Sequence, residues 1–431
     1  MDFTQSRTLY ESAVRRIPGG VHSSTRVRSP HPIYFERAQG QYLWDVDGNR
    51  WLDFVQGNGA IILGHGHPAV QAAVRDALAA GITTGSETRQ SVEAAELLLA
   101  QVPTADAARF ANSGTEAVMH AMDLARSATG RPRIAKVEGA YHGWHAAVHV
   151  SAWPDLAKAG PVERPEPVMT HRGVDQEASR RTLILPFNDV AATRELVEEH
   201  RDELAAVLVE PVMMDIGYVE ATPEYLGELR RLTERYGIVF VFDELLTGFR
   251  IAPGGAQEYY GIRPDLSTFG KAIANGYPIA AVAGRREIMD EAGPGGGCAW
   301  VGTFNAHAVN VAAASASLRM LAGGGVWREL QAKTETLISR FTAAAAERGE
   351  DLVVGGRGGN FHWYFAKPPI YDYRSAARAN AERHQRFAAS AFSRGIWLAA
   401  GALSHHSLTL AHDEADLDAL VACLDPAPSL A

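Results

Sequence analysis

The 431-residue sequence contains only two cysteines, Cys298 and Cys423. Two thiols are too few for a disulfide framework or a cysteine metal cluster, and such scarcity is typical of a reducing cytoplasm. No stretch of about 18 consecutive apolar residues occurs, which excludes a helical membrane span. Residues 1–7 also lack the apolar region of a signal peptide. We therefore expect a cytoplasmic protein that has no membrane partner.

Charge of one sign is not concentrated anywhere in the chain. The 41 basic and 50 acidic residues give a net charge of −9, and neither sign forms a long run. This balance argues against nucleic acid and against an anionic membrane surface as partners. A hydrophobic content of 46% and a charged content of 21% are typical of a globular protein, and a chain of this length is expected to hold at least two domains.

Short apolar segments alternate with helical patterns through the middle of the chain. The apolar segments predict strands at 107–111, 134–137, 183–185, 205–209, 238–242 and 266–269. Helices are predicted between them, near 115–128, 190–203 and 223–236. This alternation indicates an α/β fold with a large, mostly parallel sheet covered by helices on both faces. We expect residues 280–283 to add an antiparallel edge strand.

The flanking regions follow a different pattern. Residues 3–17 predict an amphipathic helix, and Asp47-Gly48 predicts a hairpin. After residue 305 we expect helices near 308–322, 327–348, 375–394 and 413–423, with strands at 361–365, 396–398 and 407–410. We therefore predict three parts: an N-terminal segment (1–60) that joins the small domain and the active site, a large domain (61–305) and a smaller α+β C-terminal domain (306–431).

Acidic residues follow one predicted buried strand, and a lysine follows another. Asp243 and Glu244 end one strand, and Lys271 follows another after Gly270. In open α/β sheets, ligands bind at this end of the strands. A lysine that holds an aldehyde as an imine and a carboxylate that keeps a pyridine nitrogen protonated are the minimum set for pyridoxal phosphate. By themselves these residues are equally compatible with a turn or helix-capping Asp and a solvated surface Lys.

A phosphate site is predicted at the turn between the strand 107–111 and the following helix. Ser113, Gly114 and Thr115 form a small polar turn in which backbone N–H groups stay unpaired at the start of the helix. Such N–H groups and the helix dipole stabilise an anion. The alternative interpretation is an ordinary Ser or Thr N-cap.

Two other features suggest a ligand, and a set of histidines has to be weighed as a metal site. Tyr141 stands at a predicted strand exit, where an aromatic ring can cover a flat heterocycle. Arg26 lies in a loop and can bind a substrate carboxylate, although a surface role is equally compatible with its position. The histidines at 142, 145 and 149 recur at helical spacing without an acidic ligand at a matching position, so we predict no metal site.

Taken together, the motifs resemble those of the class III pyridoxal-phosphate-dependent aminotransferases, in particular the subgroup around glutamate-1-semialdehyde 2,1-aminomutase. The resemblance covers residues 15–420 and implies fold type I. The motifs that carry it are Gly19-Gly-Val-His-Ser23, Leu63-Gly-His-Gly-His-Pro68, Ala111-Asn-Ser-Gly-Thr-Glu-Ala117, Tyr141-His-Gly143, Glu210-Pro-Val212, Asp243-Glu-Leu-Leu-Thr-Gly-Phe-Arg250, Gly254-Gly-Ala-Gln257, Lys271, Gly302-Thr303 and Leu410-Ala-His412.

The resemblance implies a role for each matched residue. Lys271 would bind the cofactor aldehyde and shuttle protons, and Asp243 would pair with the ring nitrogen. The remaining cofactor contacts would come from the phosphate turn (Ser113, Gly114 and Thr115), from Tyr141 stacked on the ring, from His142 beside it and from Glu210 near its hydroxyl edge. Thr303 would reach the phosphate of a partner subunit, which implies a homodimer with shared active sites. Arg26 would bind the substrate carboxylate.

The sequence also departs from the aminomutase pattern. Residues 146–181 replace a Gly/Ser-rich gate, Asn58 replaces an active-site tryptophan, and Asp215 replaces an asparagine. These departures favour a ping-pong aminotransferase that moves an amino group from a donor amino acid to a keto or aldehyde acceptor. The alternatives are glutamate-1-semialdehyde 2,1-aminomutase, an amino-acid racemase or epimerase, and a binding relative without catalysis.

Overall fold

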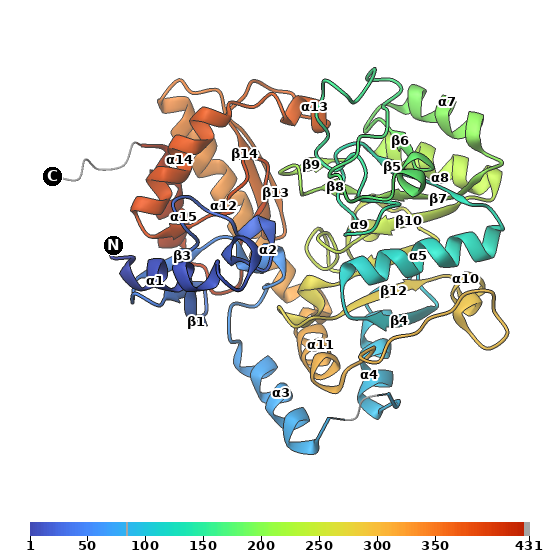
Figure 1. The fold of residues 1–431 in the computed structure, drawn as a ribbon, viewed down its shortest axis with the longest axis horizontal. Helices are drawn as coiled ribbons and strands as arrows, with labels where there is room; N and C mark the ends of the chain where they lie inside the picture. Colours follow the sequence, from blue (N-terminus) through green and yellow to red (C-terminus); the bar gives the residue numbers. More distant parts are fainter. Residues whose placement is uncertain (83–84, 426–431) are drawn as a thin grey trace.

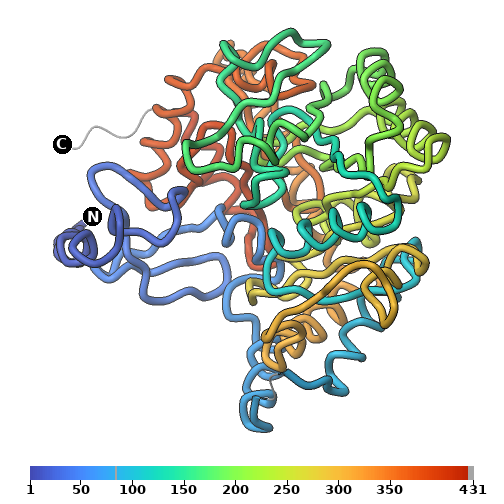
Figure 2. The backbone as a smooth tube through the Cα atoms, turned by 45° about the vertical axis from the view of Figure 1, so that its right-hand side comes forward, coloured from blue at the N-terminus to red at the C-terminus, as the bar shows by residue number. Residues whose placement is uncertain are grey.

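The computed structural model describes residues 1–82 and 85–425. Figure 1 shows the central sheet and its helices on one side of the molecule, and the N-terminal and C-terminal segments packed together on the other. The turned view in Figure 2 shows the same pairing of the blue N-terminal segment with the red C-terminal one. Among the described residues, no helix combines the length and the apolar character needed to cross a membrane.

A seven-stranded sheet forms the centre of the fold. Its strands, in spatial order, are β4 (Ala107–Ala111), β12 (Ala280–Gly284), β11 (Leu266–Phe269), β10 (Val239–Asp243), β7 (Leu204–Val209), β5 (Arg133–Val137) and β6 (Leu183–Leu185). Only β12 runs against its neighbours. The predicted α/β fold with a large, mostly parallel sheet is therefore confirmed. The prediction that residues 280–283 form an edge strand is wrong, because β12 pairs with β11 on one side and with β4 on the other.

Side chains alternate along each strand, so each face of this sheet presents its own apolar residues, and helices cover both faces. In β10, Phe240 and Phe242 pack in a core with α7 (Val190–His200) and α8 (Pro223–Tyr236). Val239 and Val241 face the opposite core, which contains the apolar side of α5 (Gly114–Thr129). Every residue of β10 is buried, which explains its continuous apolar pattern.

A third core joins the sheet to the rest of the chain. The Ala-rich α11 (Ala308–Leu321) packs against α3 (Pro68–Ala80) and α4 (Arg89–Leu99) at the base of Figure 1. Its small side chains allow these helices to approach closely. The same core continues into α12 (Gly325–Glu347), α14 (Ala381–Ser393) and α15 (Glu414–Val421).

The two ends of the chain form smaller sheets. A meander of β1 (Phe35–Gln39), β2 (Tyr42–Asp45) and β3 (Arg50–Asp53) is completed by β15 (Ile396–Trp397), which pairs in parallel with β3. A three-stranded sheet contains β13 (Val353–Arg357), β14 (Asn360–Tyr364) and β16 (His406–Ser407). The predicted strand at 396–398 thus pairs with β3, more than 340 residues earlier in the sequence, and belongs to the sheet of the N-terminal segment.

The remaining elements are short. They are α1 (Thr4–Ala13), α2 (Gln56–Gly59), α6 (Gln176–Arg180), α9 (Ala256–Tyr260), α10 (Arg286–Met289), α13 (Tyr373–Ala376), β8 (Val212–Met213), β9 (Val219–Glu220), and 3-10 turns at Pro18–Gly20, Ser24–Arg26, Lys271–Ala274, Asp290–Ala292, Ala322–Gly324 and Ala422–Leu424.

Two helix predictions are corrected. The helix predicted at 375–394 is divided into α13 and α14, because Asp372 and Asn380 each cap a separate helix. The helix predicted at 3–17 ends at Ala13, four residues before the extended Ile17. The division into parts at residues 60 and 305 stays a prediction, and residues 426–431 of the predicted C-terminal domain lie outside the described residues.

Candidate active site

The Asp243 carboxylate lies at the carboxyl end of β10, with 3% of the residue exposed. Its Oδ2 accepts a hydrogen bond from Nδ1 of His142 at 2.8 Å. Its Oδ1 accepts from the Thr268 hydroxyl and from the Leu245 backbone N–H, both at 3.1 Å. Among the described residues, no lysine or arginine pairs with it. A buried carboxylate without a cationic side chain is suited to pair with a cationic ligand atom.

His142 is fully buried beside this carboxylate. Burial lowers the pKa of His142, and this effect outweighs the opposing influence of Asp243. The neutral imidazole therefore donates through Nδ1 to Asp243, while its buried Nε2 has no hydrogen-bond partner in the described part of the chain. His142 thus orients the acid without neutralising its charge.

Glu244 follows Asp243 but has a different environment. Its carboxylate accepts hydrogen bonds from the Thr247 hydroxyl, the Ala256 N–H, and the backbone and side-chain amides of Gln257. The Ala256 and Gln257 groups lie at the start of α9, so Glu244 fixes that helix to the end of β10. Burial raises the pKa of Glu244. Of the two acids at this strand end, only Asp243 is available to a ligand.

The predicted phosphate turn forms the start of α5. Ser113 is the N-cap and accepts from the Glu116 N–H at 3.2 Å. The N–H groups of Gly114 and Thr115 have no acceptor among the described residues. The Thr115 hydroxyl accepts from the Trp144 N–H at 3.1 Å, which leaves its own hydrogen free to donate. Unpaired N–H groups at the start of a 16-residue helix suit an anion such as phosphate.

Lys271 begins the 3-10 turn that follows β11. Its φ of 49° is unusual for a residue with a side chain, and such backbone outliers concentrate at functional sites. Its amine makes no hydrogen bond or ion pair with any described residue. The adjacent Gly270 approaches Leu245 so closely that a Cβ there would lie 2.6 Å from its side chain, and the same distance applies at Gly114. Leu245 therefore lies where the Lys271 turn, the Asp243 turn and the phosphate turn meet.

Glu210 and Tyr141 come from neighbouring strand ends. The Tyr141 N–H donates to Glu210 Oε1 at 3.1 Å. Burial, with the nearby charges of Asp215 and Asp243, raises the pKa of Glu210 well above its ordinary value. The protonated form of Glu210 can then donate a hydrogen bond. The Tyr141 ring stacks on Trp153, with 5.3 Å between ring centroids and an interplanar angle of 17°.

Arg26, Asn58 and Thr303 are all exposed, and none of them hydrogen-bonds to Asp243 or Lys271 in the described structure. Thr303 nevertheless belongs to a loop beside the phosphate turn, since Asn305 Oδ1 accepts from Asn112 Nδ2 at 3.0 Å. The single chain thus assembles Asp243, His142, Glu210, Tyr141 and the phosphate turn. It leaves the other three side chains facing outward.

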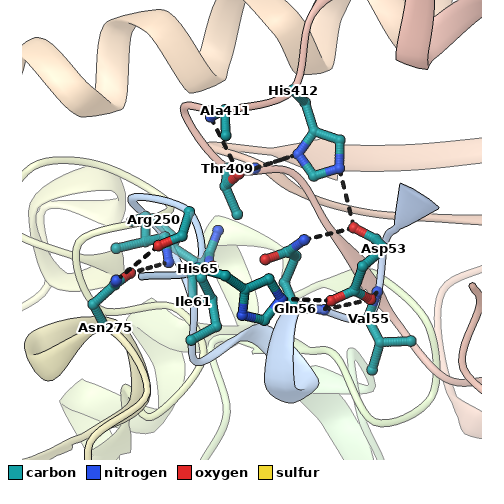
Figure 3. A network of polar contacts seen from close by, with 12 residues as sticks. Asp53, Val55, Gln56, Ile61, His65, Arg250, Asn275, Thr409, Ala411 and His412 are labelled. Carbon is teal, nitrogen blue, oxygen red and sulfur yellow. Dashed lines mark hydrogen bonds and ion pairs between the residues drawn. The ribbon is translucent and has the colours of Figure 1, made fainter. Parts of the chain in front are cut away.

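Figure 3 shows Arg250 and Asn275 next to Ile61, which follows the bend that contains Asn58. Arg250 is completely buried and donates to the carbonyl oxygens of Gly59 and Ile61 at 3.0 and 2.8 Å. Asn275 accepts from the N–H groups of Ile62 and Leu63, both at 2.9 Å. Arg250 follows the Asp243 turn and Asn275 follows the Lys271 turn, so both turns hold the same N-terminal segment.

The histidines at 142, 145 and 149 do not converge on one point. His142 Nδ1 meets Asp243, and His149 Nδ1 lies 2.6 Å from the Thr170 hydroxyl. Within residues 1–82 and 85–425, no group of three or more His, Cys, Asp or Glu side chains has a metal-binding arrangement.

Two contacts were not foreseen from the sequence. The Thr268 hydroxyl donates a hydrogen bond to Asp243. The sign that could have predicted this contact is the place of Thr268 on β11, directly opposite Asp243 in the parallel register. Trp153 stacks on Tyr141 and donates through Nε1 to the Asp215 carbonyl at 2.6 Å. It lies in the segment 146–181, which shows no periodicity that would place its side chain.

The assembled residues fit pyridoxal phosphate. A flat ring with a basic nitrogen, a phosphate and an aldehyde needs a buried acid, unpaired N–H groups and a free amine. Asp243, the Gly114 and Thr115 N–H groups, and Lys271 meet these needs in turn.

Comparison with known proteins gives a consistent family. The model of the "Aminotransferase class-III" family matches residues 23–407. A glutamate-1-semialdehyde 2,1-aminomutase from Syntrophobacter fumaroxidans is 39% identical over 417 residues, covering 96% of this chain and 95% of the relative. The crystal structure of an omega-transaminase from Sphaerobacter thermophilus superposes with a TM-score of 0.92 at 36% identity, covering 97% and 96% of the two chains. A transaminase with bound pyridoxal phosphate gives a TM-score of 0.89 at 31% identity, with 98% of both chains covered.

The family match spans most of the chain, and the similar structures are transaminases that share its complete fold. The fold type I assignment is thereby confirmed. The chain belongs to the class III aminotransferase family and is a pyridoxal-phosphate-dependent enzyme of that kind.

Proposed function

We propose that this enzyme transfers an amino group from a donor amino acid to a separate keto or aldehyde acceptor in two half-reactions. The observation that carries the proposal is the combination of a buried Asp243 without a cationic side-chain partner and a Lys271 amine without a hydrogen bond, on adjacent strands of one sheet. An acid and an amine in these positions serve opposite ends of one heteroaromatic cofactor.

When bound, pyridoxal phosphate supplies an electron sink for the substrate's breaking C–H bond. Asp243 keeps the ring nitrogen protonated, and His142 and Thr268 hold its two oxygens in place. Ser113, Gly114 and Thr115 bind the phosphate. Glu210, in its protonated form, donates to the hydroxyl edge of the ring, and Tyr141 covers one face.

Lys271 holds the cofactor and then moves a proton. Its amine would remove the proton from the donor's α-carbon and pass it to the cofactor within the first half-reaction, and in the second it would deliver a proton to the acceptor's carbonyl carbon. The side chain has no hydrogen bond that must be broken for this movement. A positioned base typically contributes about 10²–10⁴-fold to a rate.

The substrate contacts require the outward-facing residues. Arg26 binds a substrate carboxylate through its guanidinium, and Asn58 lines the same pocket on the bend held by Arg250 and Asn275. Thr303 reaches the phosphate of a partner subunit, so the working unit is a homodimer with two shared sites. The exposed Val301 and Phe304, which flank Thr303, support such an interface. The compartment is the cytoplasm.

The second candidate is an aminomutase acting on glutamate semialdehyde, which the 39% identical relative favours. Against it stands the segment 146–181, which is fixed by internal contacts such as Trp153 to Asp215 and His149 to Thr170. An aminomutase must retain its intermediate behind a movable gate, whereas a two-substrate enzyme must release its first product. Racemisation or epimerisation on the same residues is the third candidate.

The deciding experiment adds a panel of donor amino acids to the cofactor-loaded enzyme. Transamination predicts that the cofactor is converted to its amino form and that one keto acid is released per site. Isomerisation of glutamate semialdehyde without a keto acid would select the aminomutase. Loss of optical activity without a keto acid would select the racemase. The Lys271→Ala enzyme serves as the control for each reaction.

A further inference from the structure

Lys136 is a completely buried lysine in β5 that has no part in the reaction above. Its Nζ donates to the carbonyl oxygens of Ala140 and Val150, at 2.6 and 2.7 Å. Among the described residues, no carboxylate lies within ion-pair distance of this ammonium. Burial lowers the pKa of Lys136 to about 7, against the opposing effect of Glu210 and Glu138. A buried lysine is rare and costly unless its donors have a specific use.

The two carbonyl groups lie at the two ends of the segment 140–150, which we name the Tyr141 loop. The Gly139 N–H donates to the Ser151 carbonyl at 2.8 Å, so the chain on either side of the loop is also joined. Val150 further forms an isolated antiparallel bridge with Met169. Lys136 therefore closes the base of this loop from inside the protein.

The Tyr141 loop contacts three separate parts of the cofactor site. The Tyr141 N–H donates to Glu210, and His142 donates to Asp243. The Trp144 N–H donates to the Thr115 hydroxyl at the phosphate turn. Gly143 packs against the same threonine so closely that a Cβ would lie 2.8 Å from its Cα. A displacement of the loop would thus change the ring-nitrogen end, the hydroxyl edge and the phosphate end together.

We propose that Lys136 is a positioning residue for the cofactor: its ammonium joins the Ala140 and Val150 carbonyls and thereby holds the Tyr141 loop against Glu210, Asp243 and Thr115. The proposal rests on the proposed function only in that these residues bind pyridoxal phosphate. Without the lysine, two buried carbonyl groups would lose their donor, and the loop would move to regain hydrogen bonds.

The test compares Lys136→Met with Ile134→Ala. Methionine keeps the unbranched side chain as far as Cε and removes its hydrogen-bond donors. Ile134 lies two residues earlier on the same buried face of β5, in a core that also contains Val148 of the loop, and it has no hydrogen-bond donor in its side chain, so its truncation tests ordinary loss of packing at this place. Both proteins are titrated with pyridoxal phosphate, and the absorption maximum of the bound cofactor is recorded. Amide hydrogen exchange of the cofactor-free proteins is followed over residues 139–151.

We expect Lys136→Met to raise the dissociation constant of pyridoxal phosphate about 10-fold or more, the loss expected for one to two hydrogen bonds. Faster exchange should be confined to the loop, and the absorption maximum should shift. Ile134→Ala, which keeps both hydrogen bonds of Lys136, should change the absorption maximum and the loop exchange much less than Lys136→Met does. Equal effects of the two substitutions, or wild-type affinity and exchange in Lys136→Met, would overturn the proposal.

If Lys136→Met fails to fold, Lys136→Gln provides the same test, because its side chain keeps a polar amide but is one bond shorter than that of lysine and cannot join the two carbonyl groups in the same way. The dissociation constant of pyridoxal phosphate and the loop exchange should then both rise; unchanged values would again overturn the proposal. The hydrogen-exchange measurement needs neither cofactor nor substrate. A failure of the proposed reaction, seen with the donor panel, is therefore separate from a failure of this inference.

Discussion

The Nδ1 atom of His142 donates a hydrogen bond to Oδ2 of Asp243 across 2.8 Å, with both side chains buried. The imidazole comes from the loop after β5 and the acid from the end of β10, 101 residues apart in the sequence. Because burial lowers the pKa of the imidazole, His142 donates in its neutral form, and the contact orients the carboxylate.

Asp243→Asn should lower kcat by about 10²–10³-fold, the scale for losing one preorganised electrostatic partner. The Tm should fall only modestly, because the His142 imidazole can change tautomer and accept from the new amide N–H. The matched control is the adjacent Glu244→Gln, which should instead destabilise the fold by about 1–3 kcal/mol, since its carboxylate accepts four hydrogen bonds around α9. Steady-state kinetics and thermal unfolding of both variants make the comparison. A stable, fully active Asp243→Asn enzyme would contradict the assigned role.

Lys271→Ala should lose the covalent bond with pyridoxal phosphate that borohydride reduces. The fold should be unaffected, because the Lys271 side chain makes no hydrogen bond to a described residue that the substitution would remove. Mass spectrometry of the reduced protein measures the bond, and Lys158→Ala, an exposed lysine on the segment 146–181, is the control. Reduction that still labels the Lys271→Ala protein at one site would move the assignment to another lysine.

Arg374→Met should destabilise the protein by about 3–5 kcal/mol, the usual cost of leaving one member of a buried ion pair alone. Arg374 on α13 donates to both oxygens of Glu138, at 2.8 and 2.9 Å, and to carbonyl groups of residues 159–161. Urea unfolding measures the change. The double variant Glu138→Gln/Arg374→Met should regain part of the loss, because no uncompensated carboxylate remains buried. Equal stabilities of the single and double variants would show that the ion pair is not the cause.

Acid should destabilise the fold through its buried neutral histidines. Burial lowers the pKa of His384 from 6.5 to about 4. Between these values the unfolded chain binds more protons than the folded one, so the stabilisation is complete above pH 6.5 and is lost as the pH falls towards 4. His384→Leu should reduce the pH slope of the unfolding free energy by about 1.4 kcal/mol per unit in this window. Urea unfolding between pH 4.5 and 8 tests this, and His171→Leu, at an exposed position, should leave the slope unchanged.

The strands around the site could be predicted well from the sequence, and the reason is local. β10 is buried on both faces, so it forms a continuous apolar run that ends at Asp243, whereas β11, although equally buried, contains two polar residues, and β4 is only partly buried. The strand-end position of Asp243 follows directly from that pattern. The start of α5 was also visible, because Ser113 is a strong N-cap followed by glycine.

The features that sequence reasoning missed depend on distant pairings. The position of β12 between β4 and β11 is decided by a strand 169 residues earlier, and nothing within residues 280–284 reports it. Thr268 became a site residue only because the register of β11 puts it opposite Asp243. The exposed side chains of Arg26, Asn58 and Thr303 were named through the family resemblance, and their roles stay predictions.

The parallel pairing of β3 with β15 has a consequence for the order in which the protein is made. Leu52 and Asp53 find their strand partners in Ile396 and Trp397, so the first sheet of the chain stays incomplete until almost the whole polypeptide has left the ribosome. The bend held by Arg250 and Asn275 follows that sheet directly and is completed only with it. Catalytic competence should therefore arise late, and removal of residues beyond 395 should abolish cofactor binding although every residue proposed to contact the cofactor remains in the chain.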